Sequence, residues 1–359
     1  MKIYVYTIAK NESKFVHRWA ESTKDADGRF VLDTGSTDNT VQLLVDEGID
    51  VHQYLYHDHF RFDRARNDNL ALIPKDADLL ICLDMDEVLC EGWRDILESK
   101  WDPSFTTVRY TYVWSHNADG SDGHKFFGEK IHIPRAKWTH PVHEILKYDV
   151  PRKDLYIPEL RIDHYPDSTK SRGQYLGLLE LSVREDPYDD RNAHYLGREY
   201  MFAGRYEDAI KMLTKHIQLP TAKWDVERAA SMRYISKCYA ELNNYDMAEL
   251  WGFRACMEVN RRENWYNLGK LYYTYSKWKS CEFAMTQCIN IDNRALDYTS
   301  DPVCWGSDPY DILSVAAYNT GDYKLSLMCA KEAHRLNPTD DRIKKNIELI
   351  ERRLKGATT

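Results

Sequence analysis

Two aspartates, Asp84 and Asp86, follow directly on an apolar run at 79–83. Such a run predicts a buried strand, which would present both carboxylates at its carboxyl end. Two carboxylates this close repel one another unless a cation lies between them. Hard divalent cations prefer carboxylate oxygens, so the pattern predicts a Mn²⁺ or Mg²⁺ site that could also hold a diphosphate. A solvated acidic strand end is the alternative.

Two further segments carry groups that suit a nucleotide. The segment 31–40 ends a predicted strand and opens a predicted helix, where small polar side chains and backbone N–H groups can meet a phosphate. The segment 60–67 places three arginines before and within a helix, and Arg66 could neutralise a diphosphate. These arginines could instead pair with surface carboxylates. Neither a Gly-rich phosphate loop nor Gly-x-Gly-x-x-Gly occurs, which argues against kinases, nucleotide hydrolases and classical dehydrogenases.

The elements that must position these groups alternate between strands and helices in the first half of the chain. Strands are predicted at 3–8, 29–33, 51–54 and 79–84, and helices at 13–22, 37–47 and 63–73, with Ser36 capping the second helix. This order predicts an α/β domain over residues 1–168, with a mainly parallel, Rossmann-like sheet and helices on both faces. Ligands of such sheets bind at the carboxyl ends of the strands.

The second half of the chain, residues 169–359, follows a helical repeat instead. Tyr195, Gly197 and Ala209 have the spacing of a tetratricopeptide helix pair. Corresponding small residues recur at 209, 248, 281 and 326, with separations of 39, 33 and 45 residues. The charged segment 340–355 would serve as a capping helix. The pattern predicts an all-α, tetratricopeptide-like domain, and an unrelated helical bundle is the alternative.

Length and composition fit a folded protein of two domains. The chain has 359 residues, of which 43% are hydrophobic and 30% charged. The net charge of −8 argues against a protein whose main role is to coat nucleic acid, because such binding needs many Lys and Arg. With no signal peptide and no long apolar run, a cytoplasmic protein without a membrane span is expected. The eight cysteines lack metal-binding spacing and are expected to be buried free thiols.

In combination, these motifs resemble the family 2 glycosyltransferases of the GT-A fold. The resemblance rests on the segments 7–12, 33–40, 62–67 and 83–87, the last of which holds the Asp-x-Asp motif. The segments 138–144 and 162–164 resemble features of bacterial or phage-type members that carry tetratricopeptide repeats behind the catalytic domain. The resemblance implies an enzyme of the bacterial cytoplasm, or of the host cytoplasm if phage-encoded. Its reaction would be an inverting, metal-dependent transfer from a nucleotide-sugar, with UDP as the family default, to a hydroxyl or thiol.

The resemblance also implies roles for individual residues. The base and ribose would be held by Thr7, Ala9, Asn11, Glu12 and Asp33. Arg66 would bind the diphosphate, Asp84 the ribose or the metal, and Asp86 the metal directly. His164 is the candidate third metal ligand, although a lone strand-end histidine is more often structural. An inverting transfer needs a general base beside the acceptor, for which Glu144 is the candidate and His143 the alternative. Both residues could instead order their loop.

Two features bear on the acceptor and on partners. Basic residues outnumber acidic ones between 124 and 153, which favours an anionic acceptor such as a phosphorylated glycan, a lipid-linked sugar or modified DNA. A mixed-charge loop is the alternative. Tetratricopeptide surfaces bind peptides, so a peptide acceptor, or a homodimer through the repeats, is a further possibility.

Two other classes of protein remain as alternatives. One is a non-catalytic tetratricopeptide scaffold with a degenerate GT-A domain, against which the intact pair of Asp84 and Asp86 counts. The other is a nucleotidyltransferase, which can also use two carboxylates and a metal on an α/β sheet. Its usual Gly-rich phosphate loop is missing from the sequence.

Overall fold

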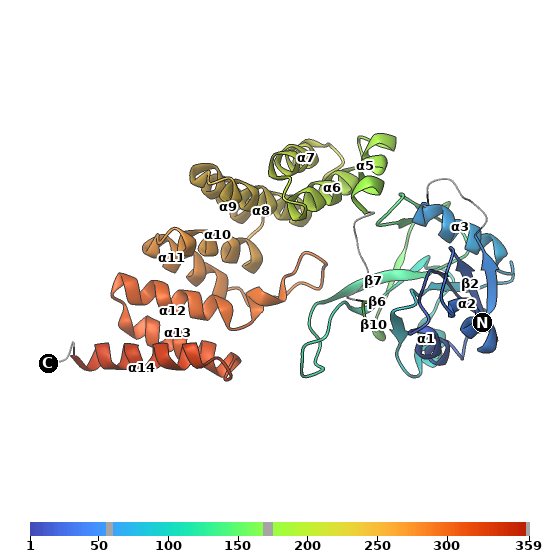
Figure 1. Ribbon diagram of the computed structural model, residues 1–359, viewed down its shortest axis with the longest axis horizontal. Coiled ribbons are helices and arrows are strands. Elements are labelled where there is room, and N and C mark those ends of the chain that lie inside the picture. Colours follow the sequence, from blue (N-terminus) through green and yellow to red (C-terminus); the bar gives the residue numbers. More distant parts are fainter. Residues whose placement is uncertain (55–59, 168–174, 357–359) are drawn as a thin grey trace. The chain divides into compact units, whose positions relative to one another are not determined.

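The computed structural model describes residues 1–54, 60–167 and 175–356, and the chain forms two compact units (Figure 1). The first unit comprises Met1–Ser182 together with the short segment Leu296–Tyr298. The second comprises Val183–Ala295 and Thr299–Thr359. The domain boundary that the sequence predicts at 168/169 lies outside the described residues.

Within the described part of the first unit, eight strands form one sheet in the order β3-β2-β1-β4-β7-β6-β10-β5. These strands are β1 (Ile3–Ala9), β2 (Gly28–Asp33), β3 (Asp50–Gln53), β4 (Leu79–Cys82), β5 (Glu87–Leu89), β6 (Thr107–Val113), β7 (Lys125–His132) and β10 (Asp154–His164). The first four along the chain pair in parallel, whereas β7 runs antiparallel to both β4 and β6. A separate hairpin joins β8 (Ala136–Thr139) to β9 (Ile145–Tyr148). The sheet is therefore mixed, with four parallel and three antiparallel pairings among these eight strands, and the mainly parallel sheet that the sequence predicts is found only in its first four strands.

Helices of the first unit hold the strand ends in place. They are α1 (Val16–Ser22), α2 (Thr40–Asp46), α3 (Phe62–Leu72) and α4 (Trp93–Lys100). Trp19 of α1 is fully buried in the core that contains Ile3 and Ile81. Its indole Nε1 donates to the carbonyl of Leu83 at 3.0 Å. This buried hydrogen bond anchors the chain directly before Asp84.

The start of α2 differs from its prediction. The helix begins at Thr40, and Asn39 occupies the N-cap position without a side-chain cap bond. The hydroxyl of Ser36, the predicted cap, instead accepts a hydrogen bond from the backbone N–H of Asn11 at 2.9 Å. The predicted cap is wrong because Ser36 joins two loops that are distant in sequence, which a local pattern does not reveal.

The second unit consists of helices packed as consecutive antiparallel pairs (Figure 1). The helix α5 (Tyr175–Glu185) spans the boundary between the units. It is followed by α6 (Asp190–Phe202), α7 (Tyr206–Gln218), α8 (Asp225–Glu241), α9 (Tyr245–Glu258), α10 (Arg262–Thr274), α11 (Trp278–Ile289), α12 (Asp308–Thr320), α13 (Tyr323–Leu336) and α14 (Asp341–Gly356). The predicted helical, tetratricopeptide-like repeat is thus confirmed as an architecture.

Small residues allow the paired helices to approach closely. The repeat positions Ala209, Ala248, Cys281 and Ser326 are all fully buried. On α6, a Cβ atom added to Gly197 would lie 2.5 Å from Cγ of Leu213 on α7. On α10, a Cβ added to Gly269 would lie 2.8 Å from Cε of Met285. At Gly197 the added Cβ would also lie 3.1 Å from the backbone nitrogen of Leu213, so a larger residue would push α6 from α7, whereas at Gly269 the flexible end of Met285 would have to move.

The unequal spacing of the repeat positions has a structural cause. Between α11 and α12 the chain contains the 3-10 helix η1 (Pro302–Trp305) within a long connection. This connection lengthens the separation between Cys281 and Ser326 to 45 residues. The last helix, α14, matches the capping helix predicted at 340–355.

Two further expectations concern the whole chain. The cysteines are free, and all but Cys90 are buried, as predicted. In the part of the chain that the structure describes, no helix combines the length and the apolar character needed to cross a lipid bilayer.

The glycine contact generates a stability prediction. Gly197→Ala should lower the free energy of unfolding by about 1–3 kcal/mol, because the added methyl overpacks against Leu213. Gly177→Ala on α5 is the matched control, since its Cβ position is open and alanine favours a helix by about 1 kcal/mol over glycine. Urea unfolding followed by circular dichroism measures both. Equal effects of the two substitutions would contradict the close packing of α6 on α7.

Candidate functional site

Asp84 and Asp86 lie in the turn that connects β4 to β5. The backbone N–H of Asp84 donates to the Glu87 carboxylate at 2.8 Å, and the N–H of Glu87 donates to the carbonyl of Asp84 at 2.9 Å. The turn places the carboxylates of the two aspartates against different partners. Asp84 is paired with cationic side chains, whereas Asp86 is paired with His164.

Lys130 of β7 lies between two carboxylates. Its Nζ is 2.6 Å from Oδ2 of Asp84 and 2.7 Å from Oε1 of Glu87. The hydroxyl of Tyr112 on β6 donates to the same Glu87 oxygen at 2.7 Å. Because Glu87 is only 1% exposed, the ammonium and the hydroxyl replace the water that its charge would otherwise need.

Arg66 of α3 is a second internal cation. Its Nη2 is 2.9 Å from Oδ1 of Asp84, and its Nε is 2.6 Å from Oε1 of Glu144. Its Nη1 lies 2.9 Å from the sulfur of Cys82. The guanidinium stacks over Trp138, with 5.3 Å between its central carbon and the ring centroid. The donors of this buried side chain are therefore directed at groups of the protein itself.

The pKa values follow from burial and from these ion pairs. Burial raises the pKa of Asp84, but Arg66 and Lys130 lower it more, so that it lies well below its usual value. Burial lowers the pKa of Lys130, yet Asp84 and Glu87 outweigh this effect and leave it well above its usual value. Burial raises the pKa of Glu87 beyond what Lys130 compensates. Burial also raises the pKa of the Cys82 thiol to about 12, so this cysteine is not a nucleophile at neutral pH.

The protein thus supplies its own cations to Asp84. The sequence predicts a metal ion because paired carboxylates need a neighbouring positive charge, but Arg66 and Lys130 already provide that charge. A diphosphate would have to compete for the guanidinium of Arg66 with its three internal partners, which are Glu144, Cys82 and Asp84. Metal binding by Asp84, Asp86 and His164 stays a prediction. A metal ion is no longer needed to compensate the charge of Asp84.

His164, at the end of β10, faces Asp86. Its Nε2 is 3.3 Å from Oδ2 of Asp86, and its Nδ1 is 2.9 Å from the carbonyl of Trp114. A carbonyl only accepts hydrogen bonds, so Nδ1 carries a proton and Nε2 is directed at the carboxylate. Burial lowers the pKa of His164, but the hydrogen bond and the charge of Asp86 raise it further. The predicted neighbours are therefore together, whereas a role as metal ligand stays a prediction.

The residues predicted to hold a nucleotide line two loops that bind one another. Oδ1 of Asn11, a residue with a φ of 54°, accepts from the N–H of Thr37 at 2.7 Å. The Asp33 carboxylate accepts from the N–H of Gly35 at 3.1 Å. The N–H of Glu12 donates to the hydroxyl of Thr40 at 2.8 Å. The side chains of Thr7 and Ala9 are buried in β1. The loops are ordered by these internal bonds, and their nucleotide role stays a prediction.

Glu144 and His143, the candidate bases, lie between β8 and β9. Oε1 of Glu144 accepts the hydrogen bond from Nε of buried Arg66. His143 has a φ of 53°, and its ring meets that of Tyr175 edge-on at a centroid distance of 6.0 Å. A positive φ is unusual for a histidine and marks a locally constrained loop. These contacts order the loop, and a role of Glu144 or His143 in proton transfer stays a prediction.

Basic residues between 124 and 153 largely have carboxylate partners. The pairs are Lys125 with Asp122, Lys130 with Asp84 and Glu87, Arg135 with Asp149, and Arg152 with Glu129 and Asp154. Much of the local positive charge is thereby neutralised within the fold. The mixed-charge alternative describes this segment better than a docking surface for an anionic acceptor.

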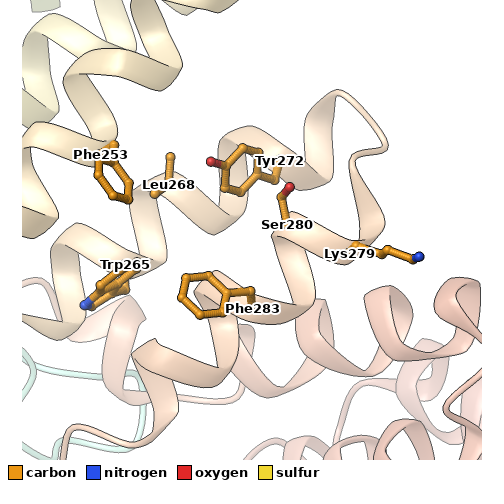
Figure 2. Close-up of a pocket in the computed structure, with 7 residues that line it drawn as sticks. All are labelled: Phe253, Trp265, Leu268, Tyr272, Lys279, Ser280 and Phe283. Atoms are coloured by element: carbon orange, nitrogen blue, oxygen red, sulfur yellow. The ribbon is translucent and has the colours of Figure 1, made fainter.

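A second candidate site lies in the second unit. A pocket of about 250 Å³ is lined by Phe253 of α9, by Trp265, Leu268 and Tyr272 of α10, and by Lys279, Ser280 and Phe283 of α11. The rings of Trp265 and Phe283 meet edge to face at a centroid distance of 5.8 Å. Figure 2 shows Phe253, Trp265, Leu268 and Phe283 together on one side of the pocket, the Tyr272 hydroxyl directed toward Leu268, and the Lys279 side chain extending away from the other lining residues.

Exposed apolar side chains continue from this pocket along α9. Leu250, Phe253 and Met257 follow one face of the helix, because residues three and seven positions apart lie above one another. They are 43%, 47% and 58% exposed, and Phe283 is 56% exposed. We call Leu250, Phe253, Met257, Trp265 and Phe283 the α9–α11 apolar surface. The spacing of Leu250, Phe253 and Met257 in the sequence was the signal that could have predicted this apolar helix face.

Comparison with known proteins bears on the second unit. No family model matches the sequence, and no curated protein sequence matches it. Similar solved structures include one described as "MamA MSR-1 C2", with 20% identity, a TM-score of 0.36, and 48% of this chain and 88% of that chain covered. Another is YrrB, "a TPR protein with an unusual peptide-binding site", with 12% identity, a TM-score of 0.37, and 48% and 81% covered. A third is the APC/C hetero-tetramer Cut9-Hcn1, with 14% identity, a TM-score of 0.40, and 51% and 33% covered.

These comparisons correct the predicted resemblance. The similar structures are tetratricopeptide-repeat proteins and not glycosyltransferases. The prediction of a family 2 glycosyltransferase and of its enzyme class is therefore wrong, whereas a divalent metal ion in the sheet unit stays a prediction. The physical reason lies in Asp84 and Arg66, whose pattern in the sequence resembles a donor site but whose charges are paired with one another.

The buried ion pairs generate a second prediction. Lys130→Met should lower the free energy of unfolding of the first unit by about 3–5 kcal/mol, since it leaves the buried carboxylate of Glu87 without its cation and the half-buried Asp84 with Arg66 alone. Lys125→Met, on the same strand, removes a more exposed pair with Asp122 and should cost less than about 1 kcal/mol. Urea unfolding of both variants provides the comparison. Similar losses of unfolding free energy in the two variants would contradict the conclusion that Lys130 stabilises the first unit through Asp84 and Glu87.

The lowered pKa of Asp84 generates a third prediction. A carboxyl whose folded-state pKa is depressed stabilises the fold above its unfolded pKa of about 3.9, and this stabilisation is lost as the pH falls below it. Asp84→Asn should therefore be less stable than the wild type at pH 7, and the difference should shrink as the pH falls from 5 toward 2. Thermal unfolding across this range measures it. A difference independent of pH would mean that Asp84 is not ionised against Arg66 and Lys130.

Proposed function

We propose that the chain is a recognition protein without catalytic activity, whose helical repeats bind a peptide segment of a partner protein. The observation that carries this proposal is the α9–α11 apolar surface. Large apolar side chains exposed in a row beside a pocket mark an interaction surface in soluble proteins. Stacked helix pairs offer such surfaces on a rigid support.

The size of the pocket favours a side chain over a small-molecule ligand. Pockets for cofactors and drug-sized molecules usually measure about 300–1,000 Å³. The pocket between α9 and α11, at about 250 Å³, lies below that range. An apolar cavity of about 150 Å³ can hold benzene, so one aromatic side chain fits. We therefore assign the pocket to a Phe, Tyr, Trp or Leu anchor of a peptide.

The polar end of the pocket favours an acidic neighbour of that anchor. Lys279 is exposed at this end, and within the described residues its ammonium forms no salt bridge. The Tyr272 hydroxyl is already engaged by the Glu249 carboxylate, so Lys279 is the group of the lining that would meet an acid. A carboxylate next to the anchor would gain a charge-assisted hydrogen bond. The expected segment thus combines an aromatic or leucine anchor with Asp or Glu one or two positions away.

The sheet unit fits a supporting role in this proposal. Its charged centre is compensated by Arg66 and Lys130, and its loops are held by internal hydrogen bonds. These features stabilise a fold without requiring a substrate. The proposal corresponds to a scaffold that presents repeats to a partner.

A peptide-binding experiment generates the fourth prediction. Peptides selected on the immobilised chain from a random library should be enriched in an aromatic or leucine anchor beside an acid. Phe253→Ala combined with Phe283→Ala should weaken the selected peptide at least tenfold, because anchor contacts commonly contribute more than about 1 kcal/mol and about 1.4 kcal/mol is tenfold. Fluorescence anisotropy with a labelled peptide measures the affinity.

Met328→Ala is the matched control, since Met328 is 59% exposed on α13 and lies outside the pocket lining. It should leave the affinity unchanged. If the selected peptide binds the double variant with the same affinity as the wild type, the proposed surface is contradicted. A dimer in sedimentation that disappears with the double variant would identify a second copy of the chain as the occupant instead.

A further inference from the structure

Two histidines and one carboxylate meet in the interior of the second unit. His194, His216 and Glu227 lie on α6, α7 and α8, and they are 0%, 1% and 4% exposed. A nitrogen of each imidazole and an oxygen of the carboxylate all lie within 4.8 Å of one another. Within residues 1–54, 60–167 and 175–356, no other three His, Cys, Asp or Glu side chains converge as closely.

Ser231 of α8 orients both imidazole rings. Its Oγ is 2.8 Å from Nδ1 of His194 and 2.8 Å from Nδ1 of His216. A hydroxyl has one proton, so it can donate to only one of the two nitrogens, and the other must donate to it. Because Nε2 of His216 faces Glu227, we assign the Nε2 proton to His216 and the Nδ1 proton to His194. Nε2 of His194 then has its lone pair available as a ligand.

The separation of His216 from Glu227 fits a bridging ion better than a hydrogen bond. Nε2 of His216 lies 3.5 Å from Oε1 of Glu227. Hydrogen bonds between such atoms usually measure about 2.7–3.2 Å. Two ligands of a tetrahedral zinc ion, each about 2.0–2.1 Å from the metal, lie roughly 3.3 Å apart. This edge of the cluster therefore already has the dimension of a metal site.

We propose that His194, His216 and Glu227 bind one divalent transition-metal ion of the zinc type, with a water molecule or Ser231 as the fourth ligand. Two imidazoles and one carboxylate are a common donor set for this ion. Binding at Nε2 of His216 requires the single proton of that neutral ring to move to Nδ1, where it can donate to Oγ of Ser231, so the ring stays neutral and keeps its proton.

The proposed ion would connect three successive helices. Each of α6, α7 and α8 contributes one ligand, and α8 also contributes Ser231. An ion bound only by the folded chain raises the stability of the repeats by mass action. The site lies apart from the residues of the α9–α11 apolar surface, and it does not depend on the proposed peptide binding.

The test uses the full chain after treatment with a chelator and dialysis. Titration with Co²⁺, a coloured substitute for Zn²⁺, should give the visible absorption of a tetrahedral site at one equivalent. Zn²⁺ should displace it and raise the midpoint of thermal unfolding by several degrees. A wild-type chain that takes up no stoichiometric Co²⁺ or Zn²⁺ overturns the proposal, and the cluster is then a polar network only.

Variants locate the ion. His216→Gln and Glu227→Gln should each weaken Co²⁺ binding at least 100-fold, while circular dichroism verifies that the helices are retained. His334→Gln on α13 and Asp86→Asn in the sheet unit are the controls and should bind Co²⁺ as the wild type does. Binding that survives His216→Gln but is lost in Asp86→Asn would place the ion in the sheet unit and contradict the proposal. If both glutamine variants fail to fold, the titration of the wild type still decides.

Discussion

The ammonium of Lys130 between the carboxylates of Asp84 and Glu87 is the contact on which the sheet unit depends. Removing charges from water costs several kcal/mol for each ion unless partners of opposite sign surround it. Here the signs alternate from Glu144 through Arg66, Asp84 and Lys130 to Glu87. Each ion is therefore satisfied only while its neighbours stay in place.

This alternation also decides what the sheet edge can do. Carboxylates that repel one another would attract a metal ion, whereas carboxylates that face Arg66 and Lys130 are already compensated. A guanidinium bound to Glu144, Asp84 and Cys82 has few donors left for a phosphate. The motif in the sequence is therefore explained by internal pairing, which is why the glycosyltransferase prediction did not hold.

Local patterns predicted the elements better than the contacts between them. Apolar runs located β1, β2 and β4 to within one or two residues, because burial of a strand leaves its mark on consecutive residues. The insertion of antiparallel β7 beside β4 left no such mark, so the sequence predicts Lys130 only as one of the basic residues between 124 and 153 that favour an anionic acceptor. His194 and Glu227, 33 residues apart, likewise share no local motif. Small residues such as Gly197 did reveal the repeat, because close helix packing constrains their size directly.

The helical repeats are closely packed in their interior, and they carry the α9–α11 apolar surface on their outside. Gly197 and Gly269 let neighbouring helices approach, and the resulting rigid stack presents Phe253 and Phe283 beside the pocket. A rigid support lowers the entropic cost of binding, so a small apolar anchor site can suffice for specific recognition. In the function that we propose, this helical surface binds the partner and the sheet unit is a support.

Hydrogen–deuterium exchange of the full chain, with and without its selected peptide, tests this account most directly. Slower exchange confined to residues of α9, α10 and α11 is the expected result. Slower exchange around Arg66, Asp84 and Asp86, with no change in those three helices, would contradict it.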